Sequence, residues 1–280
     1  LRRSGTRFGQ RARDMQEVGC GHCLGCRSEQ RRQWGVRMMH EAQMHDSAWF
    51  VTLTYDDDAI PENGSLRPDD FKSFIKSVRR DYPAGTVSYF GCGEYGTETR
   101  RPHYHAVLYG AHFLDRYLHT TRSSGHVWKS ESLERHWPHG LTEFGAVTFA
   151  SACYVASYIQ KKVVAYDDPE FYTRVVPDTG ELVELHPEFA RMSLRPAIGR
   201  RWIEKYWREV YPDDYVIVDG RECKPPRYYD KWMDENHPEV MYDVRVKRMS
   251  QLEDVPQAKL EARRKIHESR NELFAAGGVF

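Results

Sequence analysis

Two histidines flank a single tyrosine in a short apolar segment, and together they could bind one metal ion. His103 and His105 lie on either side of Tyr104 in the segment RPHYHAVLY. In a β-strand, residues two apart share a face and their backbones are about 7 Å apart, so the two imidazoles can converge. Imidazole binds several divalent metals, but a hard ion that serves a phosphate usually also takes a carboxylate ligand.

Glu94 is the candidate carboxylate, because it precedes His103 by nine residues and a short hairpin would bring it beside the imidazoles. A site of two histidines and one carboxylate with open coordination positions can polarise a phosphoryl oxygen. The alternative is coincidence, since a chain with 13 histidines in 280 residues is expected to contain a close pair.

Two tyrosines and two lysines form a second chemical pattern. Tyr154 and Tyr158 are four residues apart in the segment YVASYIQKK, which places both phenols on one face of a predicted helix. Lys162 continues that face, next to Lys161. A phenol with a pKa of about 10 is a weak nucleophile until a metal or a cation favours the phenolate, which can attack phosphorus and form a covalent ester. Tyrosines at helical spacing are also typical of a core, but a face that ends in lysines is not fully buried, and a phosphate would be a suitable partner.

The cysteines favour a metal site or reduced thiols over a disulfide scaffold. Cys20, His22, Cys23 and Cys26 lie in the segment CGHCLGC, and three thiolates with an imidazole are the ligand types of a structural Zn²⁺ site. His22 is adjacent to Cys23, so a fourth ligand could come from elsewhere, and reduced structural or redox-sensitive thiols are the alternative. The other three cysteines are scattered, which indicates a reducing compartment.

Charge is unevenly distributed along a chain whose formal net charge is zero, with 41 basic and 41 acidic residues. Residues 1–37 hold nine arginines and three acids, and residues 191–208 hold six basic residues and one acid. Residues 167–188 hold seven acids and one arginine. The basic segments could contact DNA phosphates, with affinity that falls steeply with salt; a solvated arm is the alternative for the N-terminus.

The composition indicates a soluble protein without a membrane partner. At 40% hydrophobic residues the chain can form a core. No apolar run approaches the roughly 18–20 residues that cross a bilayer, and the arginine-rich start has no signal-peptide pattern. The first residue is leucine and not methionine, which indicates a processed, truncated or partial sequence. A Walker-type phosphate loop is absent, so any DNA unwinding would need another protein.

Hydrophobic periodicity predicts an α+β fold. Neighbouring predicted strands are too close in sequence for crossover helices, which favours a central antiparallel sheet flanked by helices. Strands are predicted at residues 48–55, 87–90, 103–109 and 145–150, and helices at 27–46, from Pro68 onward, at 152–164, 196–210 and 256–274. The predicted organisation is a basic, cysteine-rich arm and helix at 1–47, a core at 48–166, an acidic loop at 167–188 and a helical region at 189–280.

The histidine pair followed by the tyrosine pair and its lysines resembles the HUH (His-hydrophobe-His) endonuclease superfamily, in the two-tyrosine form used by rolling-circle replication initiators. Tyr104 fills the position where the superfamily name expects a plain hydrophobe. Over roughly residues 18–230 the chain resembles the replication initiators of gokushovirus-type microviruses. The additional segments that carry this resemblance are the 48–55 strand, Gly93–Gly96, Arg191–Leu194 with Ile198–Gly199, and Pro225–Asp230.

The resemblance implies a ferredoxin-like (RRM-like) core, with extra N- and C-terminal segments, in which the tyrosine helix lies across the strand of the histidine pair. It implies Mg²⁺ or Mn²⁺ held by His103, His105 and Glu94. It also implies Tyr154 and Tyr158 as nucleophiles, with Lys161 or Lys162 as an electrostatic aid.

The implied activity is the nicking of single-stranded origin DNA through a 5′-phosphotyrosine intermediate and the rejoining of ends to circularise phage genomes. Origin or replicative-form DNA would be the substrate, host helicase and polymerase the partners, and the host bacterial cytoplasm the location. One alternative is a plasmid relaxase or a transposase of the same superfamily, which would share the chemistry. The other is a non-catalytic, zinc-containing DNA-binding module.

Overall fold

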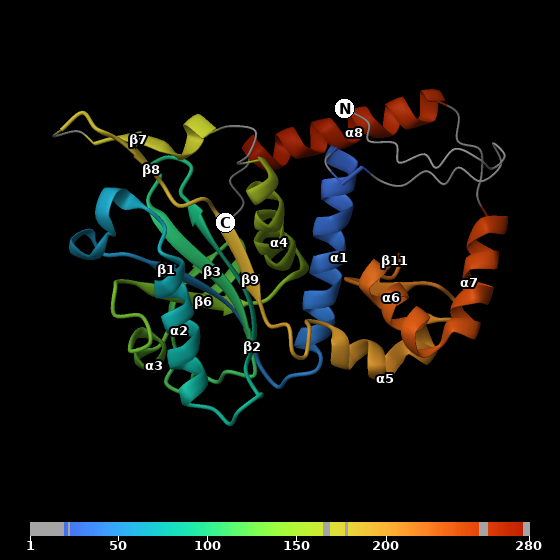
Figure 1. The fold of residues 1–280 in the computed structure, drawn as a ribbon. Helices are drawn as coiled ribbons and strands as arrows, with labels where there is room; N and C mark the ends of the chain where they lie inside the picture. Colours follow the sequence, from blue (N-terminus) through green and yellow to red (C-terminus); the bar gives the residue numbers. More distant parts are fainter. Residues whose placement is uncertain (1–19, 22, 165–168, 177–178, 252–256, 277–280) are drawn as a thin grey trace.

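A seven-stranded antiparallel sheet lies at the centre of the computed structural model (Figure 1). The structure describes residues 20–21, 23–164, 169–176, 179–251 and 257–276. The strand order β4-β5-β6-β1-β3-β2-β9 confirms the predicted α+β class. The strands are β1 (Ala48–Thr54), β2 (Ser88–Tyr95), β3 (Pro102–Tyr109), β4 (Tyr117–Arg122), β5 (Gly125–Lys129), β6 (Thr142–Ala146) and β9 (Phe189–Met192).

Helices cover both faces of this sheet, and two short hairpins lie outside it (Figure 1). The helices are α1 (Leu24–Ala42), α2 (Pro68–Arg80), α3 (Glu131–Glu134), α4 (Phe149–Val164), α5 (Arg200–Val210), α6 (Arg227–Asn236), α7 (Pro238–Ser250) and α8 (Gln257–Ala276). The hairpins pair β7 (Thr173–Val175) with β8 (Leu182–Glu184) and β10 (Val216–Val218) with β11 (Arg221–Cys223).

Alternation along β3 divides the core into two layers. Tyr104, Ala106 and Leu108 face α2, whose apolar stripe is buried as its spacing predicted. Val107 and Tyr109 face α1 and α4 on the opposite side. The side chains of the histidine pair share the face of Val107 and Tyr109, so they lie in the layer that also contains α4.

Several elements differ from their predicted bounds. The strand predicted at 145–150 is wrong, because β6 ends at Ala146 and α4 begins at Phe149. The reason is a reciprocal capping arrangement, in which the Ser151 N–H donates to Thr148 Oγ1 at 3.0 Å and the Thr148 N–H donates to Ser151 Oγ at 2.9 Å. β2 is longer than predicted and continues through Tyr95. The acidic segment contains the β7–β8 hairpin, and the β4–β5 hairpin was not predicted.

Helix α1 joins the sheet to the C-terminal helices (Figure 1). Arg37 donates from Nε and Nη2 to the Ile198 carbonyl at 3.0 and 2.9 Å, and Glu41 accepts from the Gly199 N–H at 2.8 Å. Gly199 has a φ of +77°, and a Cβ there would lie 2.8 Å from the Tyr229 hydroxyl. Two buried charged residues of α1 therefore fix the Ile198–Gly199 segment.

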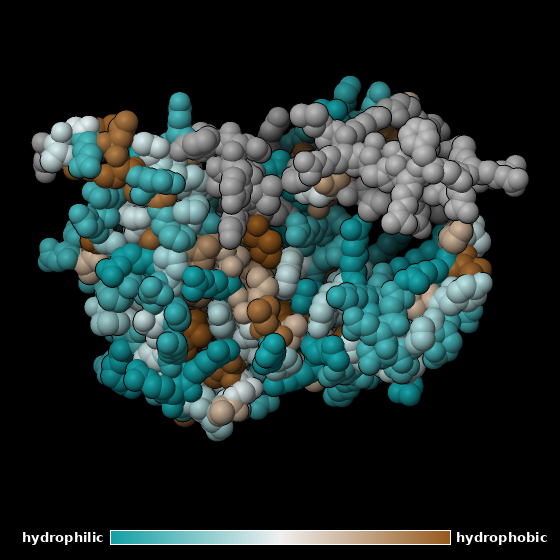
Figure 2. Space-filling view, viewed as in Figure 1, coloured by the Kyte–Doolittle hydropathy of each residue, from teal (hydrophilic) through white to brown (hydrophobic). Residues whose placement is uncertain are grey.

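The surface shows no sign of a membrane span in the part of the chain that the structure describes. None of its helices is both long enough and apolar enough to cross a bilayer. Hydrophilic residues cover most of the face drawn in Figure 2, and the hydrophobic residues on it gather in a central band.

His40 of α1 is a buried neutral base whose effect on stability depends on pH. Its ring stacks on Trp202 at 3.6 Å between centroids, and its Nδ1 lies 2.9 Å from the Tyr229 hydroxyl. Burial lowers the pKa of His40 to about 3, from 6.5. Below pH 6.5 the unfolded chain therefore binds a proton that the folded chain excludes, so stability falls as pH falls from 6.5 toward 3.

We expect the free energy of unfolding to fall by about 2 kcal/mol more in the wild type than in His40→Gln between pH 7 and pH 5. Urea unfolding at both pH values measures this difference, and comparing the two proteins removes the contribution of the other titrating groups. Equal losses in the two proteins would contradict it.

Candidate active site

Strand register brings the sequence-predicted ligands together. Glu94 on β2 is directly opposite His103 on β3, and Thr52 on β1 is directly opposite His105. Glu94 had been expected beside the pair through a short hairpin, and it lies there on a continuous strand. Paired residues on neighbouring antiparallel strands have Cβ atoms about 5 Å apart, so these side chains are in reach of one another.

Glu94 Oε1 is the shared acceptor of this cluster. It lies 2.7 Å from His103 Nε2 and 2.8 Å from His105 Nε2. The carboxylate is only 3% exposed, and one ligand atom from each of the three residues lies within 4.8 Å of the others. Two imidazole nitrogens and a carboxylate oxygen are a suitable donor set for a divalent cation, and these residues therefore fit a metal site.

The outer nitrogens of the two imidazoles have defined partners. His103 Nδ1 lies 3.1 Å from the Arg101 carbonyl, which can only accept, so this nitrogen carries the proton. In its neutral form His103 then presents the Nε2 lone pair to the cluster. His105 Nδ1 lies 3.0 Å from Thr52 Oγ1, and a hydroxyl can donate or accept. Such outer partners orient metal-binding imidazoles.

The pKa directions follow from burial and from the shared carboxylate. Burial would raise the pKa of Glu94, but hydrogen bonds and charge from both histidines outweigh burial, and the pKa lies well below its usual range. Burial would lower the pKa of His103, yet the hydrogen bond to Glu94 raises it overall. For His105 burial prevails and lowers the pKa. The cluster thus holds an anionic carboxylate beside one imidazole that favours its proton and one that does not.

Helix α4 brings the two tyrosines to this cluster. The Tyr154 hydroxyl donates to Glu94 Oε1 at 2.7 Å, and the Tyr158 hydroxyl donates to the Tyr154 hydroxyl at 3.0 Å. The Tyr154 ring also meets the His105 ring edge-on, with 5.4 Å between centroids. Burial raises the pKa of Tyr154, and the charge of Glu94 raises it further. Without a cation the phenol is therefore held neutral.

The close approach of α4 to the sheet depends on small side chains. Ala152 and Ala156 are fully buried against β2 and β3, together with Val155. Their small size lets the helix lie near the strands, so the tyrosines reach the carboxylate. Tyr158 is 4% exposed and lies behind Tyr154, which is only partly buried.

Two other predicted groups are less fully described. Lys161 and Lys162 continue α4, but their side chains lie outside the described part of the structure, and so does His22. Cys20, Cys23 and Cys26 do come together, within 4.8 Å of one another.

A groove of about 490 Å³ runs from Tyr154 and the histidines to the β4–β5 hairpin. Its polar lining includes residues that the sequence-based reasoning missed, namely Thr52, Thr54, Arg101, Arg122, Ser124, His126, Glu143, Thr148 and Ser151. Arg122 pairs with Glu143 at 2.9 Å, and Arg101 pairs with Asp57. Alternation along β1, which places both threonines on the face of Phe50, could have revealed Thr52.

Comparisons with known proteins agree with this site. A family model described as the replication-associated protein ORF2 type matches residues 48–163, which include all five residues of the cluster. The chain is 36% identical over 239 residues to the replication-associated protein VP4 of Bdellovibrio phage phiMH2K, covering 81% of this chain and 71% of that protein. It is 30% identical over 248 residues to the replication-associated protein ORF2 of Spiroplasma virus 4, covering 82% and 73%.

A third relative is the replication-associated protein ORF4 of Chlamydia phage 1, which is 26% identical over 218 residues, with 75% of this chain and 52% of that protein covered. No solved structure matches the chain. The chain belongs to the replication-associated proteins of gokushovirus-type microviruses, which confirms the resemblance in its motifs.

Thr52 should support metal binding through His105. We expect Thr52→Val to weaken Mn²⁺ binding about 10-fold, because the nitrogen that orients the ligand loses its partner. Thr54→Val is the matched control, since Thr54 lies two residues along the same strand and its hydroxyl points to the Leu141 carbonyl at 3.5 Å. Titration calorimetry with Mn²⁺ measures both. An unchanged affinity in Thr52→Val would contradict the role of Thr52.

Proposed function

We propose that this protein initiates rolling-circle replication by nicking single-stranded origin DNA through a phosphotyrosine intermediate and rejoining the ends. The observation that carries the proposal is the convergence of two imidazoles and a tyrosine hydroxyl on one buried carboxylate oxygen, Glu94 Oε1. A metal-binding set in direct contact with a nucleophilic side chain is the arrangement that phosphoryl transfer to tyrosine requires.

In this proposal each residue has a defined task. Glu94, His103 and His105 hold Mg²⁺ or Mn²⁺, which when bound polarises the scissile phosphate and offsets the negative charge of Glu94. The Tyr154 oxygen attacks phosphorus, the bond to the 3′ oxygen breaks, and that oxygen takes up a proton. The products are a 5′-phosphotyrosine and a free 3′-hydroxyl. Lys161 and Lys162 are proposed to add positive charge near the transferred phosphate.

Tyr154 is the better placed of the two tyrosines for the first attack. It contacts Glu94 directly and lines the groove, whereas Tyr158 is nearly buried and reaches the cluster only through the Tyr154 hydroxyl. Tyr158 can donate to the oxygen of Tyr154 and favour its phenolate form. After Tyr154 holds a 5′ end, Tyr158 would attack at the regenerated junction, and the released 3′-hydroxyl would then close the circle without ATP.

The groove is the proposed path of the DNA strand. Arg101 and Arg122 lie along it on either side of the cluster, and side-chain hydroxyls between them can bind phosphate oxygens. A groove of this kind suits a single strand held by its backbone, with affinity that falls as salt rises. Host helicase and polymerase would supply unwinding and synthesis in the host cytoplasm.

A relaxase or transposase would use the same chemistry, but the relatives bear the name of replication-associated proteins, which favours replication. A non-catalytic binding module has no need for a phenol hydrogen-bonded to a buried carboxylate. The two alternatives differ in whether the protein becomes covalently attached to DNA.

Tyr154→Phe should abolish covalent attachment to DNA. The protein is incubated with Mn²⁺ and a single-stranded origin oligonucleotide labelled either on its 5′ side or on its 3′ side. We expect only the 3′-side label to transfer to the wild type, and we expect EDTA to prevent the transfer. Tyr158→Phe should still form the adduct but lose the second transfer, since its hydroxyl is one step away from Glu94.

Tyr242→Phe is the matched control, because Tyr242 is 67% exposed on α7 and distant in sequence from the cluster. Adduct formed by Tyr154→Phe but not by Tyr158→Phe would reverse the proposed order. Absence of an adduct from every variant and the wild type, across metals and origin sequences from related phages, would reject the nicking activity.

A further inference from the structure

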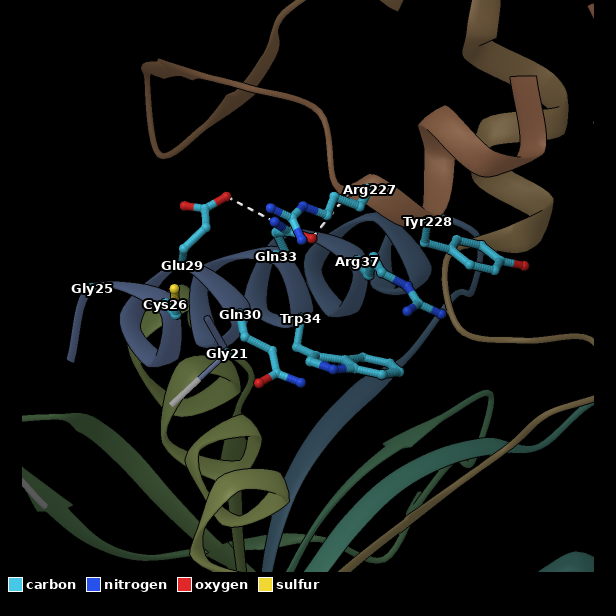
Figure 3. Close-up of a pocket in the computed structure, with 10 residues that line it drawn as sticks. All are labelled: Gly21, Gly25, Cys26, Glu29, Gln30, Gln33, Trp34, Arg37, Arg227 and Tyr228. Atoms are coloured by element: carbon cyan, nitrogen blue, oxygen red, sulfur yellow. Dashed lines mark hydrogen bonds between the residues drawn. The ribbon is translucent and has the colours of Figure 1, made fainter. Parts of the chain in front are cut away.

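The three cysteines before and within the first turn of α1 form a cluster that the nuclease chemistry does not use. Cys20 Sγ and Cys26 Sγ are 3.9 Å apart, and the sulfurs of all three residues lie within 4.8 Å of one another. Cys20, Cys23 and Cys26 form no disulfide. Cys26 lies at one end of a pocket of about 420 Å³ along α1, next to Gly25 (Figure 3).

The distances are those of ligands around one ion. Two thiolates on a tetrahedral Zn²⁺ with bonds of about 2.3 Å are about 3.8 Å apart. The Cys23 N–H also donates to Cys20 Sγ at 3.2 Å, a bond that turns the chain and stabilises negative charge on that sulfur. In an iron–sulfur cluster each thiolate binds a different iron, which spaces the sulfurs more widely than in this cluster.

The start of α1 lacks the usual groups that stabilise a helix N-terminus. Cys23 is the N-cap and its side chain makes no capping hydrogen bond, and no acidic residue lies in the first turn. Zn²⁺ with three thiolates carries a net charge of −1, and negative charge is favourable at this end of a helix. The ion would therefore supply the missing charge and tie Cys20 to the helix.

We propose that Cys20, Cys23 and Cys26 bind a structural Zn²⁺ ion that fixes the N-terminus of α1. Three protein ligands leave one tetrahedral position for water or a further ligand. Soft thiolates select Zn²⁺, whereas the carboxylate and imidazoles of the active site suit Mg²⁺ or Mn²⁺, so the two sites hold different metals. The role is structural, because α1 carries the buried contacts of Arg37 and Glu41 to the C-terminal region.

The test uses the full chain purified under reducing conditions. We expect about one equivalent of zinc per chain by mass spectrometry of the metal. The amount should fall several-fold in Cys23→Ser and in Cys26→Ser. Cys223→Ser is the matched control and should retain the zinc, because Cys223 lies on β11 outside the cluster. Glu94→Gln should also retain it, which separates this ion from the active-site metal.

Replacement of zinc by Co²⁺ tests the ligands even where a variant folds poorly, since it uses the wild type. Thiolate ligands give an intense sulfur-to-cobalt charge-transfer band in the near ultraviolet, and carboxylate and imidazole ligands do not. We expect this band in the wild type and in Glu94→Gln. Zinc-free wild type that fails to take up Zn²⁺, or Co²⁺ binding without the band, would overturn the proposal. Either result is independent of whether the protein nicks DNA.

Discussion

One buried oxygen, Glu94 Oε1, is the contact on which the rest of the site depends. It accepts hydrogen bonds from both imidazoles and from the Tyr154 hydroxyl, which come from a neighbouring strand and from a helix about 60 residues further along the chain. A carboxylate that is 3% exposed is stable only with such partners. The sheet register and the position of α4 therefore serve the same purpose, which is to bring these donors to one anion.

The parts of the fold with strong periodicity could be predicted from the sequence. β1 and α2 have clear apolar patterns because each buries one side against the core, and both were found where expected. The β4–β5 hairpin was missed because β4 is almost wholly exposed, so its sequence YLHTTR has no alternation to detect. β9 was missed because it has four residues and gains its place only by pairing with β2.

The candidate site was predictable to the same extent. The spacing of the histidines and of the tyrosines defines which side chains share a face, and this is a local property of strands and helices. The neighbours that orient them, Thr52 and the Arg101 carbonyl, depend on which strands pair and in which register. Register is a tertiary property, so only the folded arrangement reveals these partners.

The buried contacts of α1 have a consequence for the size of the smallest nuclease fragment. The family match ends at residue 163, yet α1 packs on α4 from one side and β9 completes the sheet edge beside β2. A fragment cut to residues 48–163 would expose the side of the core that Met38 covers and the open edge of β2. A fragment that kept α1 but stopped after β9 would leave Arg37 and Glu41 as isolated charges. Catalytic and C-terminal regions are thus inseparable by simple truncation.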